Sequence, residues 1–360
     1  MSVKGKEWGQ ALYSLQNLHS MSSCFLLGPI DSSLVKLQSL SVFRLNNNNF
    51  TSSVPETFDG LTNLTTLHLR NCNLIGMFPK QIFQISNLQV LDLSDNQNLQ
   101  GSLPYFQHNA FLRSLNLSRT GFSGQLPSYL LNLRMVSSLD LSKSKFHGRL
   151  PSSISELTSL VHLDLSFNNF TGSLPFFNMS KNLSYLYVNN NGLEGEIPSF
   201  HFKGLENPVF IDLGRNFLNG SIPSSLFTLP SLGGLSLSHN KFEGLLDEFP
   251  NASSSPLEVL DISGNNLQGH ISLSIFHLKR LSFIEFSSNM FNGTIHLDMF
   301  KSMENLATLD LSHNTLLVDG NLMSDQIHHS PFPKLSNLML ASCKLRKLEI
   351  SQTSIQFVVP

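Results

Sequence analysis

The sequence predicts an α/β solenoid, in which short repeats stack on one another and share one core. Three observations support this prediction: a period of 24 residues, an alternating apolar strand in each period, and an asparagine at a fixed distance after that strand. A fixed period of roughly 20 to 29 residues with the spacing L-x-x-L-x-L-x-x-N is typical of leucine-rich repeats. The aligned core position is occupied by Leu45, Leu69, Leu93, Leu117, Leu141, Leu165, Val188, Leu213, Leu237, Ile262, Phe286 and Leu311.

Each repeat is expected to begin with one short strand. In LTSLVHLDLSFNNFTGSLP, residues 157–175, the alternation assigns Leu163 and Leu165 to the core and Asp164 and Ser166 to the outside. Parallel strands of this kind stack about 4.8 Å apart. The pattern therefore predicts a right-handed leucine-rich-repeat superhelix whose strands form a concave parallel β-sheet.

The residue three positions after the aligned core position is predicted to fill the turn that leaves the strand. An asparagine amide there can satisfy buried turn carbonyls and accept from the backbone. All three cysteines fall on this position, so each is expected to be a small buried side chain rather than a nucleophile, a metal ligand or part of a disulfide. The residues at this position are Cys24, Asn48, Cys72, Asn96, Thr120, Ser144, Asn168, Asn191, Asn216, Asn240, Asn265, Asn289, Asn314 and Cys343.

The second half of each repeat carries an inward aromatic residue and then the motif G-x-[IL]-P. Glycine permits a positive φ or a close backbone approach, and proline ends strand pairing. We therefore expect short second strands, followed by irregular or 3₁₀ turns on the convex side, such as residues 152–154. The aromatic residues expected to form a core spine are Phe50, Phe122, Phe146, Phe170, Phe242 and Phe291.

The repeat pattern divides the chain into five segments. Residues 1–30 are a degenerate first repeat with an N-terminal lead, and residues 31–316 are regular repeats. An insertion at 317–334, rich in Asp, Gly, Ser and Pro, is expected to form a surface loop. Residues 335–348 carry the last repeat, and residues 349–360 form a divergent tail.

The composition excludes several classes of function. A formal net charge of -2 gives no basic footprint for nucleic acid. The first thirty residues lack the apolar core of a secretory signal, and no run of about 18 apolar residues is present to span a membrane. Because repeat material begins almost directly after Met1, we expect a fragment or a truncated product.

The titratable residues give little reason to expect chemistry. Glycosidases use two carboxyl groups about 5–9 Å apart, a distance that stacked strands would provide. A repetitive column of carboxylates nevertheless has no single pair in a distinct environment, so we expect a solvated, hydrogen-bonded ladder, no enzyme activity and no cofactor. The adjacent His328 and His329 lack flanking ligands at metal-binding spacing. The outward carboxylates are Asp92, Asp140, Asp164, Asp212, Asp261, Glu285 and Asp310.

The outward strand positions are the best candidates for recognition, because aromatic and arginine side chains anchor interfaces. Tyr185 and Tyr187 on one strand, with Phe210, Asp212 and Arg215 on the next, form the most promising cluster. Scattered exposed side chains are the competing interpretation. The candidates for ligand binding on the concave face are Arg44, His68, Arg70, His162, Tyr185, Tyr187, Phe210, Asp212, Arg215, His239 and Phe283.

Nine N-x-[ST] sequons are candidates for glycosylation. A chain this rich in Asn, Ser and Thr carries many sequons by chance, so their number is weak support for secretion. Asn116 lies within the strand expected at 115–117, where a glycan would obstruct part of the sheet face. The candidates are Asn49, Asn63, Asn116, Asn169, Asn178, Asn182, Asn219, Asn251 and Asn292.

Three stretches match a known family beyond the consensus leucines. They are residues 61–84, residues 247–271 with the sequence DEFPNASSS, and residues 332–345 with the sequence LASCKL. Together with the repeat L-x-x-L-x-x-L-x-L-x-x-N-x-L-x-G-x-I-P, they resemble plant-specific leucine-rich repeats. More narrowly, the chain is similar, roughly over residues 7–346, to plant receptor-like proteins of the Verticillium-wilt-resistance group.

The resemblance implies a segment that recognises a pathogen- or self-derived ligand, by protein–protein, peptide or glycan binding, in a receptor-like protein of plant defence signalling. Full-length members are similar in having a secretory signal, an extracellular solenoid, one membrane helix and a leucine-rich-repeat receptor kinase as co-receptor. The implied location is the extracellular face of the plasma membrane. Two alternatives stay open: a secreted inhibitor of a microbial cell-wall hydrolase, and a truncated, non-functional receptor fragment.

Overall fold

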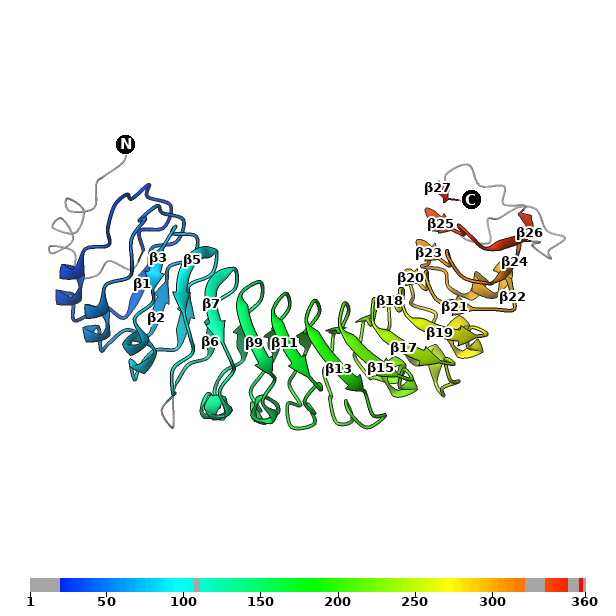
Figure 1. The fold of residues 1–360 in the computed structure, drawn as a ribbon, viewed down its shortest axis with the longest axis horizontal. Coiled ribbons are helices and arrows are strands. Elements are labelled where there is room, and N and C mark those ends of the chain that lie inside the picture. Colours follow the sequence, from blue (N-terminus) through cyan, green and yellow to red (C-terminus); the bar gives the residue numbers. More distant parts are fainter. Residues whose placement is uncertain (1–19, 107–110, 321–333, 349–355, 359–360) are drawn as a thin grey trace. The chain divides into compact units, whose positions relative to one another are not determined.

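The computed structural model describes residues 20–106, 111–320, 334–348 and 356–358. The chain divides into two compact units, unit 1 up to Leu183 and unit 2 from Ser184. In both units a repeat contributes one strand to a main parallel sheet, then in most repeats a second strand and a 3₁₀ turn. Figure 1 shows the strands of each unit stacked in chain order. The predicted leucine-rich-repeat solenoid, with parallel strands and 3₁₀ turns, is confirmed.

Unit 1 has two sheets and a row of 3₁₀ turns. The main-sheet strands are β1 (Val42–Arg44), β2 (Thr66–His68), β4 (Val90–Asp92), β6 (Ser114–Asn116), β8 (Ser138–Asp140) and β10 (His162–Asp164). The second strands are β3 (Ile75–Met77), β5 (Asn96–Gly101), β7 (Thr120–Gly124), β9 (Lys145–Arg149) and β11 (Asn169–Gly172). The 3₁₀ turns are η2 (Ser32–Lys36), η3 (Glu56–Gly60), η4 (Lys80–Gln84), η5 (Ser128–Asn132) and η6 (Ser152–Glu156).

Unit 2 repeats this arrangement, except that the last three of its second strands form a separate sheet. The main-sheet strands are β12 (Tyr185–Tyr187), β14 (Phe210–Asp212), β16 (Gly234–Ser236), β18 (Val259–Asp261), β20 (Phe283–Glu285), β23 (Thr308–Asp310), β25 (Asn337–Met339) and β27 (Gln356–Val358). The second strands are β13 (Gly192–Glu196), β15 (Phe217–Gly220), β17 (Lys241–Gly244), β19 (Asn266–Gly269), β21 (Met290–Phe291), β22 (Thr294–His296), β24 (Leu317–Gly320) and β26 (Lys344–Leu348). The 3₁₀ turns are η7 (Ser224–Thr228), η8 (Ala252–Ser254), η9 (Leu273–His277) and η10 (Leu297–Ser302).

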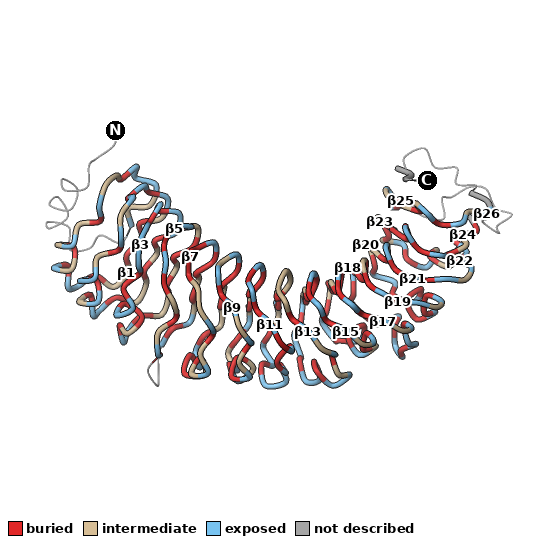
Figure 2. The backbone as a smooth tube through the Cα atoms, in the orientation of Figure 1, coloured by how far each residue is buried: buried red, intermediate tan, exposed pale blue. Residues whose placement is uncertain are grey.

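The core of each unit runs between its strands and its turns, as the buried stretches in Figure 2 show. The middle residue of the main-sheet strands, such as Leu163, is fully buried, and all six residues of the predicted aromatic spine are fully buried. The rings of Phe146 and Phe170 stack with their centroids 6.4 Å apart. Ser166, which was predicted to face outward, is 5% exposed because its hydroxyl donates to Asp164 Oδ1 at 2.6 Å.

The asparagine ladder holds neighbouring coils together as predicted. Asn216 Nδ2 lies within 3.2 Å of three carbonyl oxygens, those of Val188, Leu213 and Gly214. Its Oδ1 accepts from the backbone N–H of Leu193 at 3.0 Å. One buried amide therefore serves two successive repeats, which is how this turn satisfies its backbone polar groups away from water.

Two of the three cysteines are buried as predicted. Cys72 Sγ donates to the Leu45 carbonyl at 3.1 Å, and burial raises the pKa of its thiol to about 12. Cys343 Sγ donates to the Leu311 carbonyl at 3.1 Å. The expectation for Cys24 is wrong, since this residue is exposed. Its thiol meets only the Ser22 carbonyl, at 3.5 Å, and no carbonyl of an earlier coil within the described residues.

The C-terminal part contains strands that the repeat pattern did not predict. Leu317–Gly320, at the start of the predicted insertion, forms β24 between β22 and β26, and Gln356–Val358 pairs in parallel with β25. Most of the predicted loop, including His328 and His329, lies outside the described residues, as does most of the predicted tail. Within the described ranges, no helix has the length and apolar character needed to cross a membrane.

Candidate functional site

The outer face of each main sheet is formed by the first and third side chains of its strands. In β10 and β14 these side chains are half-buried, while the middle one enters the core. Neighbouring strands pair residue for residue, so equivalent positions form columns across the sheet. We call these outward side chains the strand face of each unit.

The strand face of unit 2 carries an aromatic cluster on two adjacent strands. Tyr185 pairs in register with Phe210, and Tyr187 pairs with Asp212. The rings of Tyr187 and Phe210 stack with centroids 5.6 Å apart and an interplanar angle of 26°. The Phe210 ring extends over Gly234, where an added Cβ would clash with it. The structure thus brings four of the predicted binding residues together.

The other candidates of unit 2 lie outside strands β12 and β14. Arg215 and His239 are exposed in the turns after their strands, with φ of 53° and 52°. Arg215 makes no ion pair among the described residues. Phe283 is half-buried on β20, in register with Val259 and Thr308.

In unit 1 the candidates on the strand face are Arg44, His68 and His162. Arg44 and His68 are in register on β1 and β2, and His162 lies on β10 beside Ser138. His68 Nδ1 is 3.7 Å from Asp92 Oδ2. Burial lowers the pKa of His68 more than the Asp92 charge raises it, so His68 is neutral at pH 7 and the contact is not an ion pair.

Aspartates of the carboxylate column accept hydrogen bonds from the turns that follow their strands. Asp140 Oδ1 accepts from both the N–H and the hydroxyl of Ser142, at 3.0 and 2.7 Å, and Asp164 does the same with Ser166. Burial raises the pKa of Asp164, although the bonds from Ser166 oppose this. Among the described residues, no three His, Cys, Asp or Glu side chains are grouped closely enough to hold a metal ion.

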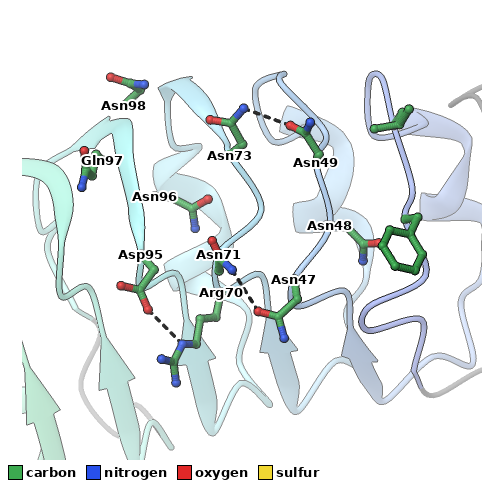
Figure 3. A pocket seen from close by; sticks show the side chains of 12 residues that line it. Asn47, Asn48, Asn49, Arg70, Asn71, Asn73, Asp95, Asn96, Gln97 and Asn98 are labelled. Atoms are coloured by element: carbon green, nitrogen blue, oxygen red, sulfur yellow. Dashed lines mark hydrogen bonds and ion pairs between the residues drawn. The ribbon is translucent and has the colours of Figure 1, made fainter. Parts of the chain in front are cut away.

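A polar hollow of about 1000 Å³ lies beside the turns of unit 1 (Figure 3). Residues 47–49, 70, 71, 73 and 95–98 line it, together with Phe25 and Leu27. Arg70, a predicted binding residue, belongs to this hollow and pairs with Asp95 at 3.0 Å. The hollow was not predicted from the sequence, and the signal that could have found it is the concentration of asparagine in three successive repeats.

The sequon asparagines occupy accessible positions. Eight of the nine are exposed, and Asn116 on β6 is half-buried. Asn116 Oδ1 accepts from the N–H and hydroxyl of Ser118, the serine of its own sequon, at 2.9 and 2.7 Å. Access by an oligosaccharide transferase would require these two bonds to open.

The repeats match a known family profile, described as Leucine Rich Repeat. The matched segments are residues 39–61, 63–85, 87–109, 111–133, 159–178, 182–203 and 256–278. With the parallel sheets and 3₁₀ turns described above, this defines the class of the protein: it is a leucine-rich-repeat solenoid.

Two relatives of known identity come from one plant. The chain is 36% identical to Receptor-like protein 6 of Arabidopsis thaliana over 135 residues, which are 34% of this chain and 14% of that protein. It is 34% identical to Receptor-like protein 7 of the same plant over 210 residues, 56% of this chain and 17% of that protein. The chain is therefore related to plant leucine-rich-repeat receptor-like proteins, and it spans less than a fifth of the length of these two.

A solved structure supports the same relationship. The plant peptide hormone receptor RGFR1, in complex with RGF2, is similar with a TM-score of 0.83 and 30% sequence identity. The match covers 96% of this chain and 54% of that one.

Proposed function

We propose that this chain is the ligand-recognition segment of a plant cell-surface receptor-like protein that perceives pathogens and signals in defence. On this proposal the aromatic cluster of Tyr185, Tyr187 and Phe210 contacts a peptide ligand. We also propose that the full-length protein belongs to the Verticillium-wilt-resistance group and lies at the extracellular face of the plasma membrane. Its proposed co-receptor is a leucine-rich-repeat receptor kinase.

The observation that carries the proposal is the arrangement of the cluster. Tyr185 is 37% exposed, and the Phe210 ring rests on a strand position that has no side chain of its own. Stacked aromatic rings present a large rigid surface at little entropic cost, which is why they anchor interfaces. Asp212 beside Tyr187 adds a carboxylate that can accept from a peptide N–H or a basic side chain.

Selection from a phage-displayed library of dodecapeptides tests this assignment. Peptides that bind the native chain should lose about tenfold or more in affinity with Tyr187→Ala or Phe210→Ala, because each removes a central aromatic anchor. Phe217→Ala is the matched control, since Phe217 is 52% exposed but lies on β15 of the second sheet. Selected peptides that bind the cluster variants and the native chain equally well would refute the assignment.

The sequon asparagines are proposed to carry glycans when the chain passes through the secretory pathway. Eight exposed asparagines on turns and second strands are open to modification. Chain secreted from plant cells should gain electrophoretic mobility after enzymatic deglycosylation. An unchanged mobility would contradict the proposed route to the cell surface.

A further inference from the structure

The hollow of unit 1 is lined by side chains whose hydrogen-bonding capacity is only half used. Figure 3 shows Asn71 pointing to Asn47 and Asn73 to Asn49, with Nδ2···Oδ1 distances of 3.1 and 2.9 Å. Within the described residues, the Oδ1 atoms of Asn71 and Asn73 and the Nδ2 atom of Asn49 have no hydrogen-bond partner. Each pair of coils thus presents a free acceptor, and Asn49 adds a free donor.

Backbone geometry fixes these amides in place. Asn47, Asn71 and Asn73 have φ of 57°, 51° and 52°, in the left-handed region where asparagine is among the few residues tolerated. Since coils repeat about every 4.8 Å, the hollow's four coils span roughly 14 Å. A short row of rigid donors and acceptors matches a ligand that repeats its own donors and acceptors along its length.

Phe25 adds an apolar wall to this polar surface. Its ring is 74% exposed, and its φ of 54° is a costly conformation for a bulky side chain. An exposed aromatic face beside free amides offers stacking for the C–H face of a sugar ring, while the amides bind the hydroxyl groups. Peptide sites differ, because they bury several apolar anchors.

The charge of the hollow favours a neutral ligand. Its charged lining residues are Arg70 and Asp95, which pair with each other at 3.0 Å, and Asp95 is also bound by Arg119 at 3.2 Å. Neither an anionic nor a cationic polymer would find an unpaired opposite charge there. We propose that this hollow is a binding site for a neutral oligosaccharide, distinct from the aromatic cluster of unit 2.

The position of one sequon determines how the site must be studied. Asn49 is the acceptor of the sequon Asn49-Phe50-Thr51, so a glycan on it would occupy the edge of the hollow. Thr51→Ala removes the sequon and leaves the Asn49 amide in the lining. Protein made in bacteria, which is free of the glycan, is the material for the binding experiment.

The test is titration calorimetry with three neutral probes, cellohexaose, N-acetylchitohexaose and xylohexaose. At least one of these should bind the bacterial protein at millimolar concentration. Asn71→Gly combined with Asn73→Gly should weaken that binding about tenfold, because it removes two amides while keeping the left-handed backbone unstrained. Phe25→Ala should weaken it to a similar degree through loss of the stacking face.

Two controls separate this site from other effects. Asn190→Gly makes the same substitution at a left-handed turn position of unit 2, with φ of 56°, and should leave oligosaccharide binding unchanged. Phe210→Ala should also leave it unchanged, so failure of the peptide site and failure of this site are distinguishable. Binding of none of the three probes, or equal binding by native, Asn71→Gly/Asn73→Gly and Phe25→Ala proteins, would overturn the proposal.

Discussion

The two units build the same turn with different side chains. In unit 2, the ladder residues Asn216, Asn240 and Asn265 each lie within hydrogen-bond distance of three carbonyl oxygens and accept from one backbone N–H. In unit 1 the ladder is interrupted by Thr120 and Ser144. Thr120 Oγ1 donates to the Leu117 carbonyl at 2.7 Å, and Ser144 Oγ donates to the same carbonyl at 2.9 Å.

This difference shows how a solenoid tolerates a degenerate repeat. The Leu117 carbonyl keeps a donor if either hydroxyl is lost, because the two hydroxyls converge on it. In contrast, the Leu193 N–H has Asn216 Oδ1 as its only acceptor among the described contacts. The amide is therefore the acceptor on which the preceding coil depends, whereas the two hydroxyls overlap at the Leu117 carbonyl.

The carboxylate columns differ in a related way. In unit 1, Asp140 is in register with Asp164, but Asn116 separates Asp140 from Asp92, so the run of facing carboxylates has two members. In unit 2, Glu285 pairs in register with Asp261 on one side and Asp310 on the other. Like charges directly opposite one another on a sheet are destabilising. Unit 2 thus has the more regular asparagine ladder, and its column contains the longer run of facing carboxylates.

Substitution of a ladder residue has the largest expected effect. Asn216→Leu should lower the free energy of unfolding by about 3 kcal/mol, because it leaves the buried Leu193 N–H without its acceptor and removes the contacts to three carbonyls. Thr120→Val should cost about 1 kcal/mol, since Ser144 still serves the Leu117 carbonyl. Urea denaturation followed by circular dichroism measures both.

Equal losses of unfolding free energy in Asn216→Leu and Thr120→Val protein would contradict this comparison. They would mean that asparagine and hydroxyl side chains stabilise the turn equally. A local readout strengthens the measurement, since long repeat arrays need not unfold in one step. Hydrogen exchange should speed up at Leu193 and its neighbours in Asn216→Leu protein while the rates in the coils of unit 1 stay unchanged.

The regular parts of the molecule were predictable because each repeat buries apolar side chains at the same positions and satisfies the same backbone groups in its turn. The 24-residue period placed Leu163 in the core and Asn216 in the turn without reference to distant contacts. Cys24 differs from Cys72 because, among the described residues, its thiol contacts the carbonyl of Ser22 in its own coil and not one in the coil before. Ser166 was misplaced because alternation describes the direction of a side chain, whereas its hydroxyl turns back to bond Asp164.

The candidate site was predictable only in part. Strand register brings Tyr187 and Phe210 together, and register follows directly from the period. The hollow of unit 1 depends on free hydrogen-bonding capacity and on the exposure of Phe25, which requires knowledge of the neighbouring coils. A run of asparagine in a sequence does not reveal which amides pair with each other and which remain free.

Substitution of Glu285, in the carboxylate column of unit 2, has the smallest expected effect on stability and the strongest dependence on pH. Burial raises the pKa of Glu285, and the charges of Asp261 and Asp310 raise it further. The folded protein therefore holds this proton at a pH where the unfolded chain has lost it, so stability falls as pH rises from the unfolded pKa through the folded one. Glu285→Gln removes that penalty.

The melting midpoint of Glu285→Gln protein should accordingly exceed that of the native chain at pH 7, by on the order of 1 °C because solvent screens a half-exposed group. At pH 4 and below, where both states are largely protonated, the difference should vanish. Glu243→Gln, on an exposed position of β17, is the control and should show no such dependence. An equal gain at both pH values would assign the effect to packing and remove the charge argument for the column.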